Sequence, residues 1–481
     1  MLGSGNRDQL EFMVCGSLRD LVPDDHVLAR VDRVLDLGWL RGEVVDLYAD
    51  GIGRPGIDPE AALRLMLAGF LLGIVHDRRL MREAQVNLAI RWFAGFGLHD
   101  RLPDHSSLTR IRQRWGADRF RRIFERTVLA CVEAKIATGE VVHVDASLVR
   151  ADVAWESLAA RHVDAVTEAD GSSETPPDDR DPPPGGGSGS ALRLERGKAP
   201  SDEAADRSRR NSKKTGRFKK VCTTDPDATM ATSGRNRRLE PSYKQHAVVD
   251  DARGIVLDVE VTTGEANEGD HLLSGLDRSA ELTGGTASVV TADAGYAYAK
   301  VFAGLKEREV TAVIPTKAEP IRSKVPLRRF RYDAHHDILK CPRGKILRPK
   351  KAKIAHGRFF SSKVRDCKGC DLAALCLSPS RATKAVVIVH DYPALLRARR
   401  RRLRWSEEDD RLYQRHCWRS EGYHGEAKTW HGLARAIRRG IDNMRIQAFL
   451  TAAAVNLKRL AAALIALLWV LQRERLRPKT A

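Results

Sequence analysis

Residues 141–149, which read VVHVDASLV, are the part of the sequence that decides the fold. The β-branched residues of this run predict a strand, and its apolar half ends at Asp145. Residues 288–292, which read SVVTA, form a second run that ends at Asp293 in the same way. The chain therefore carries at least two strands that each run into an aspartate.

A third carboxylate, Glu421, opens the segment 421–428, EGYHGEAK, in a region with a helical pattern. Two divalent cations about 3.5–4 Å apart need oxygen ligands from several elements, because one short segment cannot surround both ions. Asp145, Asp293 and Glu421 meet this requirement, so they are candidate catalytic residues and metal ligands for phosphodiester chemistry. Lys428 faces the same way seven residues on, where its ammonium can contact a phosphate.

The sequence offers other carboxylates for these roles. Asp and Glu are common at strand ends for structural reasons, since turns favour them, so any one of the three is by itself more readily structural. The rival acids are Asp152, Asp250, Asp251, Asp258, Glu265, Glu268 and Asp270. Spacing alone also leaves Glu426 open as an alternative to Glu421.

The bulk composition indicates the partner. The chain has 481 residues and a formal net charge of +19, which favours a polyanion, and nucleic acid is the natural phosphodiester. Membrane association is not expected, because residues 1–13 lack an apolar signal core and the apolar stretch 460–471 is shorter than the ~20 residues that span a bilayer. Eight cysteines, four of them clustered late, do not suggest a disulfide framework and predict a reducing, cytoplasmic location.

The N-terminal region predicts a helical, DNA-binding domain. Asp58 followed by Pro59 is a strong helix start, and a further helix follows Pro103-Asp104. This last helix carries Arg110, Arg112 and Arg114, which we predict to contact DNA in the manner of a helix-turn-helix. The alternative is an ordinary helical bundle with a solvated basic face.

The middle of the chain predicts a mixed sheet of the α/β (α+β) class. Residues 243–249 and 255–262 form a hairpin, and strands 287–292 and 310–314 flank a helix at 298–307. Two insertions interrupt it. Residues 168–200 are rich in Pro and Gly and predict disorder, followed by a basic stretch at 207–220.

The sequence of the second insertion, residues 319–390, predicts a basic module that contacts DNA and has little apolar core of its own. Between Arg322 and Arg365 it has fifteen Lys and Arg residues but only two acidic ones. The predicted segments are 1–138 (helical, DNA-binding), 139–167 (core, first strand), 168–220 (insert), 221–318 (core, middle), 319–390 (basic insertion), 391–472 (core, Glu helix and closing helices) and 473–481 (tail).

The quoted stretches resemble bacterial insertion-sequence transposases of the DDE type, which have an RNase H-like core. Three stretches are similar to the family's N-terminal helical domain: RPGIDP (54–59), NLAIRWF (87–93) and LPDHSSL (102–108). Four are similar to its catalytic core: HVDASLV (143–149), ADAGY (292–296), EGYHGEAK (421–428) with Arg438-Arg439-Gly440, and NLKRL (456–460).

The resemblance implies that Asp145, Asp293 and Glu421 bind two Mg²⁺ ions. The implied reaction is cleavage at the ends of a mobile element and transfer of the freed 3′-end into target DNA. Double-stranded DNA, as terminal inverted repeats and target, is then the partner, and synapsis of two ends predicts at least a homodimer associated with the nucleoid. Lys428, Arg438 and Arg439 are implied DNA contacts.

Four cysteines, Cys341, Cys367, Cys370 and Cys376, lie in the basic insertion. The Cys-x-x-Cys spacing at 367–370 lets two thiolates reach one Zn²⁺, and two more can complete a tetrahedral site. The alternative is four reduced thiols without a metal. The resemblance supports zinc, because related transposases carry a similar cluster in this insertion.

Two other functions stay open. A nuclease on the same core, such as a junction resolvase, would cut DNA without strand transfer. A DNA-binding protein derived from a transposase would do neither, although three carboxylates in intact surroundings argue against such decay.

Overall fold

The structure is a computed structural model, and it describes residues 16–48, 56–154, 157–162, 218–232, 239–317, 324–354, 357–378 and 380–475. The chain divides into two compact units. Residues 1–136, 426–438 and 442–481 form the helical unit, and residues 137–425 with 439–441 form the sheet unit. The predicted disordered insert lies outside the described residues, except for its last three.

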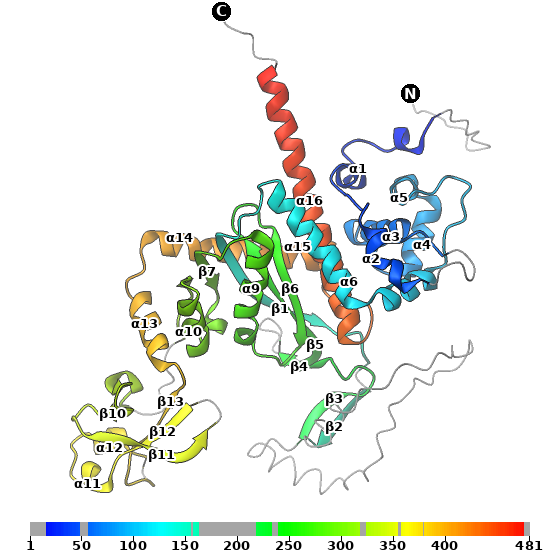
Figure 1. Ribbon diagram of the computed structural model, residues 1–481. Coiled ribbons are helices and arrows are strands. Elements are labelled where there is room, and N and C mark those ends of the chain that lie inside the picture. Colours follow the sequence, from blue (N-terminus) through cyan, green and yellow to red (C-terminus); the bar gives the residue numbers. More distant parts are fainter. Residues whose placement is uncertain are drawn as a thin grey trace, which may run out of the picture. The chain divides into compact units, whose positions relative to one another are not determined.

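The helical unit contains the predicted N-terminal helices (Figure 1). Asp58 caps α3 by accepting a hydrogen bond from the Glu60 amide, and Asp104 caps α6 in the same way. Residues 77–93 form two helices, because Asn87 ends α4 and its side chain caps α5. The helices are α1 (Val27–Asp32), α2 (Leu40–Val44), α3 (Pro59–Leu71), α4 (Asp77–Val86), α5 (Leu88–Phe93), α6 (His105–Glu133, broken at Gly116) and α16 (Ile441–Arg475).

Helix α16 forms much of the core of the helical unit. Phe449 stacks on Phe124 of α6 with ring centroids 6.1 Å apart, and the buried Thr451 donates to the His431 carbonyl. Residues 441–470 are long and apolar enough to cross a membrane, and this is the one such helix among the described residues. The buried polar side chains of Gln447, Thr451 and Asn456 in α16 donate hydrogen bonds to protein groups.

The sheet unit is built on a six-stranded mixed sheet, with β6, β5, β1, β7 and β8 side by side and β4 beside the start of β5 (Figure 1). The pairs β6–β5 and β5–β1 are antiparallel, whereas β1–β7 and β7–β8 are parallel. This is the RNase H-like arrangement, so the predicted fold class is confirmed. The strands are β1 (Val141–Arg150), β4 (Thr229–Thr232), β5 (Leu239–Asp250), β6 (Val256–Thr263), β7 (Val289–Ala292) and β8 (Thr311–Val313).

Helices follow the strands as the sequence pattern indicates. Helix α9 packs on β5 and β6, and α14 packs against β7 and β8. The helices of this unit are α9 (Leu272–Thr283), α10 (Ala299–Glu307), α13 (Tyr392–Arg402), α14 (Glu407–His416) and, continuing across its end, α15 (Gly422–Trp430). A separate two-stranded antiparallel sheet pairs β2 (Leu158–His162) with β3 (Phe218–Cys222).

The basic insertion contains a second, five-stranded antiparallel sheet that the sequence analysis did not predict (Figure 1). It has a core of its own, centred on Leu339, Leu347 and Phe360. The expectation of a module with little core was therefore wrong. Its elements are β9 (Arg331–Asp333), β10 (Ile338–Lys340), β11 (Ile346–Ile354), β12 (Gly357–Ser361), β13 (Ala385–Val389) and the one-turn helices α11 (Val364–Cys367) and α12 (Ala373–Cys376).

Candidate active site

The parallel pairing of β1 with β7 brings two predicted aspartates together. Val144 pairs with Ala292, so Asp145 and Asp293 follow at the same level of neighbouring strands. Asp293 Oδ1 accepts a hydrogen bond from the Gly295 amide at 2.6 Å and caps the turn Ala294–Tyr296. Asp145, which lies within β1, and Asp293, which follows the last residue of β7, are therefore neighbours in the sheet.

Glu421 reaches this place from a π-helical turn, Cys417–Glu421, inserted between α14 and α15. Such turns often mark functional sites, because they rotate a side chain out of helical register. Burial raises the pKa of Asp145 to about 7, and the negative charges of Asp293 and Glu421 add to the rise. Burial also raises the pKa of the Cys417 thiol, and the same three carboxylates add to that rise. The structure thus gathers the three predicted acids.

Glu426, the open alternative, has a different environment. It belongs to the helical unit, where Lys458 Nζ lies 2.8 Å and Arg459 3.0 Å from its carboxylate. Burial works to raise the pKa of Glu426, but hydrogen bonds from His431 and Lys458, with the charge of Arg459, hold it well below its ordinary range. A carboxylate bound by two cations has little capacity left for a metal, which favours Glu421.

A buried hydrogen-bond chain connects the three acid-bearing elements. His143 Nε2 lies 3.0 Å from Asp251, His143 Nδ1 lies 2.6 Å from Thr291 Oγ1, and Thr291 Oγ1 lies 3.0 Å from His416 Nδ1. Burial lowers the pKa of both rings, that of His416 to about 4, so both are neutral near pH 7. Neutral rings permit one consistent proton order: His143 donates to Asp251, Thr291 donates to His143, and His416 donates to Thr291.

This chain of hydrogen bonds fixes the geometry of the site, because its residues lie close in sequence to the three acids. His143 and Thr291 lie two residues before the two aspartates, on the same faces of β1 and β7. His416 immediately precedes the π-helical turn. The turn is also held by Tyr423, whose buried hydroxyl accepts a hydrogen bond from Gln245 of β5 at 2.8 Å. The sequence analysis did not select any of these residues.

The donor set suits a hard divalent cation, since carboxylate oxygens are the ligands that Mg²⁺ prefers. A side chain on Gly295 would place its Cβ 2.6 Å from Asp293 Oδ1 and 3.3 Å from Oδ2, so the glycine keeps a space beside this carboxylate open. Among the described residues, no three potential ligands already converge on one point. The chemistry of the donors therefore fits the metal, although the ligands are not preformed around one ion.

The predicted DNA-binding arginines differ in their surroundings. Arg112 is buried against Asp77, with Arg438 bound to the same carboxylate, so the prediction that Arg112 contacts DNA was wrong. Arg110 and Arg114 are exposed on α6, and the Arg114 guanidinium lies 4.7 Å from the centre of the Tyr48 ring. Arg439 is also exposed.

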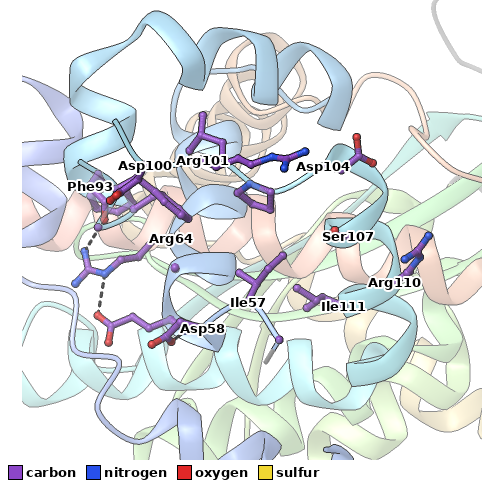
Figure 2. A pocket seen from close by; sticks show the side chains of 18 of the residues that line it. Ile57, Asp58, Arg64, Phe93, Asp100, Arg101, Asp104, Ser107, Arg110 and Ile111 are labelled. Atoms are coloured by element: carbon purple, nitrogen blue, oxygen red, sulfur yellow. Dashed lines mark hydrogen bonds and ion pairs between the residues drawn. The ribbon is translucent and has the colours of Figure 1, made fainter. Parts of the chain in front are cut away.

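A cavity of about 1200 Å³ opens in the helical unit beside Arg110 (Figure 2). Asp58, Asp100 and Asp104 line it together with Arg64 and Arg101, so its charge is mixed. The Arg64 guanidinium already donates hydrogen bonds to the Glu60 carboxylate and to the Phe93 carbonyl. The cavity is therefore no dedicated phosphate site, and the exposed face of α6 is the better candidate for contact with DNA.

The four predicted zinc ligands line one small cavity of about 30 Å³ in the basic insertion. Burial raises the pKa of the Cys376 thiol, Lys384 opposes the rise, and the charges of the other three cysteines add to it. The one-turn helices α11 and α12 bring Cys367, Cys370 and Cys376 to Cys341, which follows β10. Cys341 thus lines the same cavity as three cysteines that lie 26 to 35 residues further along the chain.

Comparison with protein families agrees with this architecture. A family model described as a transposase domain (DUF772) matches residues 16–114, and one described as a transposase DDE domain matches residues 340–461. No curated protein matches the chain. The first match covers most of the helices α1 to α6, and the second covers the cysteine cavity and the Glu421 turn.

The helical N-terminal region, the RNase H-like sheet and the gathered acids define a DNA-processing enzyme of the DDE class. The chain belongs to the insertion-sequence transposases of the DDE type. It is a transposase and acts on DNA.

Proposed function

We propose that this transposase cuts DNA at the ends of its own insertion sequence and joins the freed 3′-ends to target DNA, using two Mg²⁺ ions. The observation that carries the proposal is the meeting of Asp145 within β1, Asp293 directly after β7, and Glu421, where one acid is already affected by the charge of the others. It acts on chromosomal DNA in the bacterial cytoplasm, and the pairing of two ends requires at least a dimer.

The residues of the chain have distinct tasks in this proposal. Asp145, Asp293 and Glu421 hold the metals. The hydrogen bonds that link Asp251, His143, Thr291 and His416 keep the three acid-bearing elements in register. When bound, the two ions supply activation of the attacking oxygen and stabilisation of the leaving oxygen. Arg110, Arg114 and Arg439 are exposed cations for DNA phosphates, and Lys428 supplies one on the helix that follows Glu421.

The experiment uses the full chain and a duplex that carries the end of the flanking element. Transposase activity predicts end cleavage that requires Mg²⁺ or Mn²⁺, followed by joining of the cut 3′-end to a second duplex. Cleavage without joining would favour a nuclease instead. End binding that is never followed by cleavage in either metal would favour a DNA-binding protein that has lost catalysis.

We also propose that Cys341, Cys367, Cys370 and Cys376 bind one structural Zn²⁺. Thiolates are preferred zinc ligands, and four of them form a closed structural site. The supporting observation is that all four line the same small cavity. Zinc would stabilise the basic insertion in addition to its apolar core.

Zinc content is expected to be about one ion per chain in the purified protein, as in closed four-cysteine sites. Metal analysis by mass spectrometry would measure it, and a chelator is expected to lower the melting temperature. Cys370→Ser should lose the metal, whereas Cys417→Ser, at an exposed cysteine outside the cavity, should keep it. Wild type without zinc, or Cys370→Ser with full zinc, would overturn the assignment.

A further inference from the structure

Glu268 is a fourth carboxylate beside the three that the sequence selects. It lies in the turn Glu268–Asp270 that follows β6, and its side chain is 31% exposed. Its negative charge adds to that of Asp293 and Glu421 in raising the pKa of Asp145, after the effect of burial. The chain folds so that this loop meets the turn that begins at Asp293.

Two glycines allow the two turns to approach so closely. A Cβ on Gly295 would lie 2.6 Å from Asp293 Oδ1 and equally 2.6 Å from Glu268 Oε2. The two carboxylate oxygens are therefore at most twice that distance apart. On the other turn, a Cβ on Gly269 would lie 2.5 Å from the ring of Tyr298. Any side chain at either position would push the turns apart.

The orientation of Glu268 suits a shared ligand. Its Oε1 lies 3.3 Å from Lys244 Nζ, and that ammonium also donates to the Ala266 carbonyl at 2.8 Å. Its Oε2 faces Asp293 instead. Because Mg²⁺ binds oxygens at about 2.0–2.1 Å, one ion joins oxygens up to about 4 Å apart. This distance lies within the upper limit, twice 2.6 Å, on the separation of Asp293 Oδ1 and Glu268 Oε2.

A buried phenol independently indicates a ligand at this place. Tyr296 is fully buried, and its hydroxyl has no hydrogen-bond partner within the part of the chain that the structure describes. The charges of Asp145, Glu268 and Asp293 all act on this hydroxyl, so it lies near all three. A buried phenol oxygen without a partner can interact with a cation or its bound water at this place.

We propose that Glu268 is a fourth metal-binding residue of the active site, which shares an ion with Asp293 through its Oε2. This inference rests on the proposed two-metal function and adds a ligand to it. Four carboxylates also balance the four positive charges of two divalent cations, which matters in a partly buried site.

The test measures Mn²⁺ binding to the full chain in complex with an end duplex, by titration calorimetry. Wild type is expected to bind Mn²⁺, and Glu268→Gln is expected to weaken binding by about tenfold or more. Glu265→Gln is the matched control, because it removes a carboxylate three residues away in the same loop and should bind as wild type does. Asp293→Asn reports on the proposed function itself.

The outcomes separate the two proposals. If Asp293→Asn loses Mn²⁺ binding and Glu268→Gln binds as wild type does, Glu268 is not a ligand and the two-metal function stands. If both variants bind as wild type does, or wild type binds no Mn²⁺, the metal site itself is wrong. Melting temperatures measured without metal check that each variant is folded, and Glu268→Asp, which keeps the charge, should bind better than Glu268→Gln.

Discussion

Asp293→Asn is expected to slow metal-dependent cleavage of an element end by at least about 10³-fold, with the fold intact. A metal ion contributes several kcal/mol of transition-state stabilisation, and each 1.36 kcal/mol is a factor of ten in rate. The carboxamide oxygen can still accept the hydrogen bond from Gly295 that caps the turn, so the local structure should survive. Single-turnover cleavage, with circular dichroism as the check on folding, measures the effect.

Glu421→Gln should show the same loss, and Glu426→Gln is its matched control. Both remove one negative charge from the same helical segment. Because Glu426 is held by Lys458 and Arg459, its replacement is expected to reduce stability but to leave the cleavage rate of the folded protein unchanged. An inactive Glu426→Gln variant together with an active Glu421→Gln variant would reverse the assignment of the glutamate. Cleavage by Asp293→Asn at the wild-type rate would exclude Asp293 as a metal ligand.

The aspartates were predictable because their signal is local. Each follows an apolar, β-branched run, and such a run is a strand whatever the rest of the chain does. The parallel register that places Asp145 beside Asp293 follows from the order of the strands in the RNase H-like sheet. The two aspartates could therefore be selected from local sequence, whereas the RNase H-like order of the strands was implied by the resemblance to the DDE transposases.

The choice among the glutamates was not predictable in this way. Glu426 accepts hydrogen bonds from Lys458 and Arg459, which lie 32 and 33 residues further along the chain. The spacing of residues within the segment 421–428 cannot predict these contacts. Glu268 stands in a polar loop without an apolar run before it. Only the close packing of two turns through Gly295 brings it to Asp293.

Two other errors have simpler causes. Arg112 shares a helical face with the buried residues Leu108 and Trp115, at spacings of four and three, so the periodicity of α6 already indicated its burial. Strands β9 to β12 of the basic insertion carry few apolar residues beside their cations, so their sequence is hard to separate from a basic loop. Strand β13, which reads AVVIV, is a β-branched run that the sequence analysis did not select.

Asp77→Ala is expected to destabilise the helical unit by about 3–5 kcal/mol. Asp77 begins α4, its side chain is 9% exposed, and it binds both Arg112 and Arg438. Burial lowers the pKa of Arg112 to about 10, the charge of Arg438 adds to that, and Asp77 opposes it. Without Asp77, the buried guanidinium of Arg112 would keep its desolvation cost and lose its counter-ion. Urea unfolding followed by circular dichroism measures the loss.

Two further variants decide whether an unpaired buried charge is the cause. Asp442→Ala removes a 73% exposed carboxylate from its pair with Arg445 in the same unit, and little change is expected because water screens such pairs. Combining Asp77→Ala with Arg112→Met removes the stranded charge while keeping apolar volume, so it should recover part of the lost stability. If the double variant is less stable than Asp77→Ala alone, Arg112 contributes through packing, and the ion pair with Asp77 is not what holds α4 to α6.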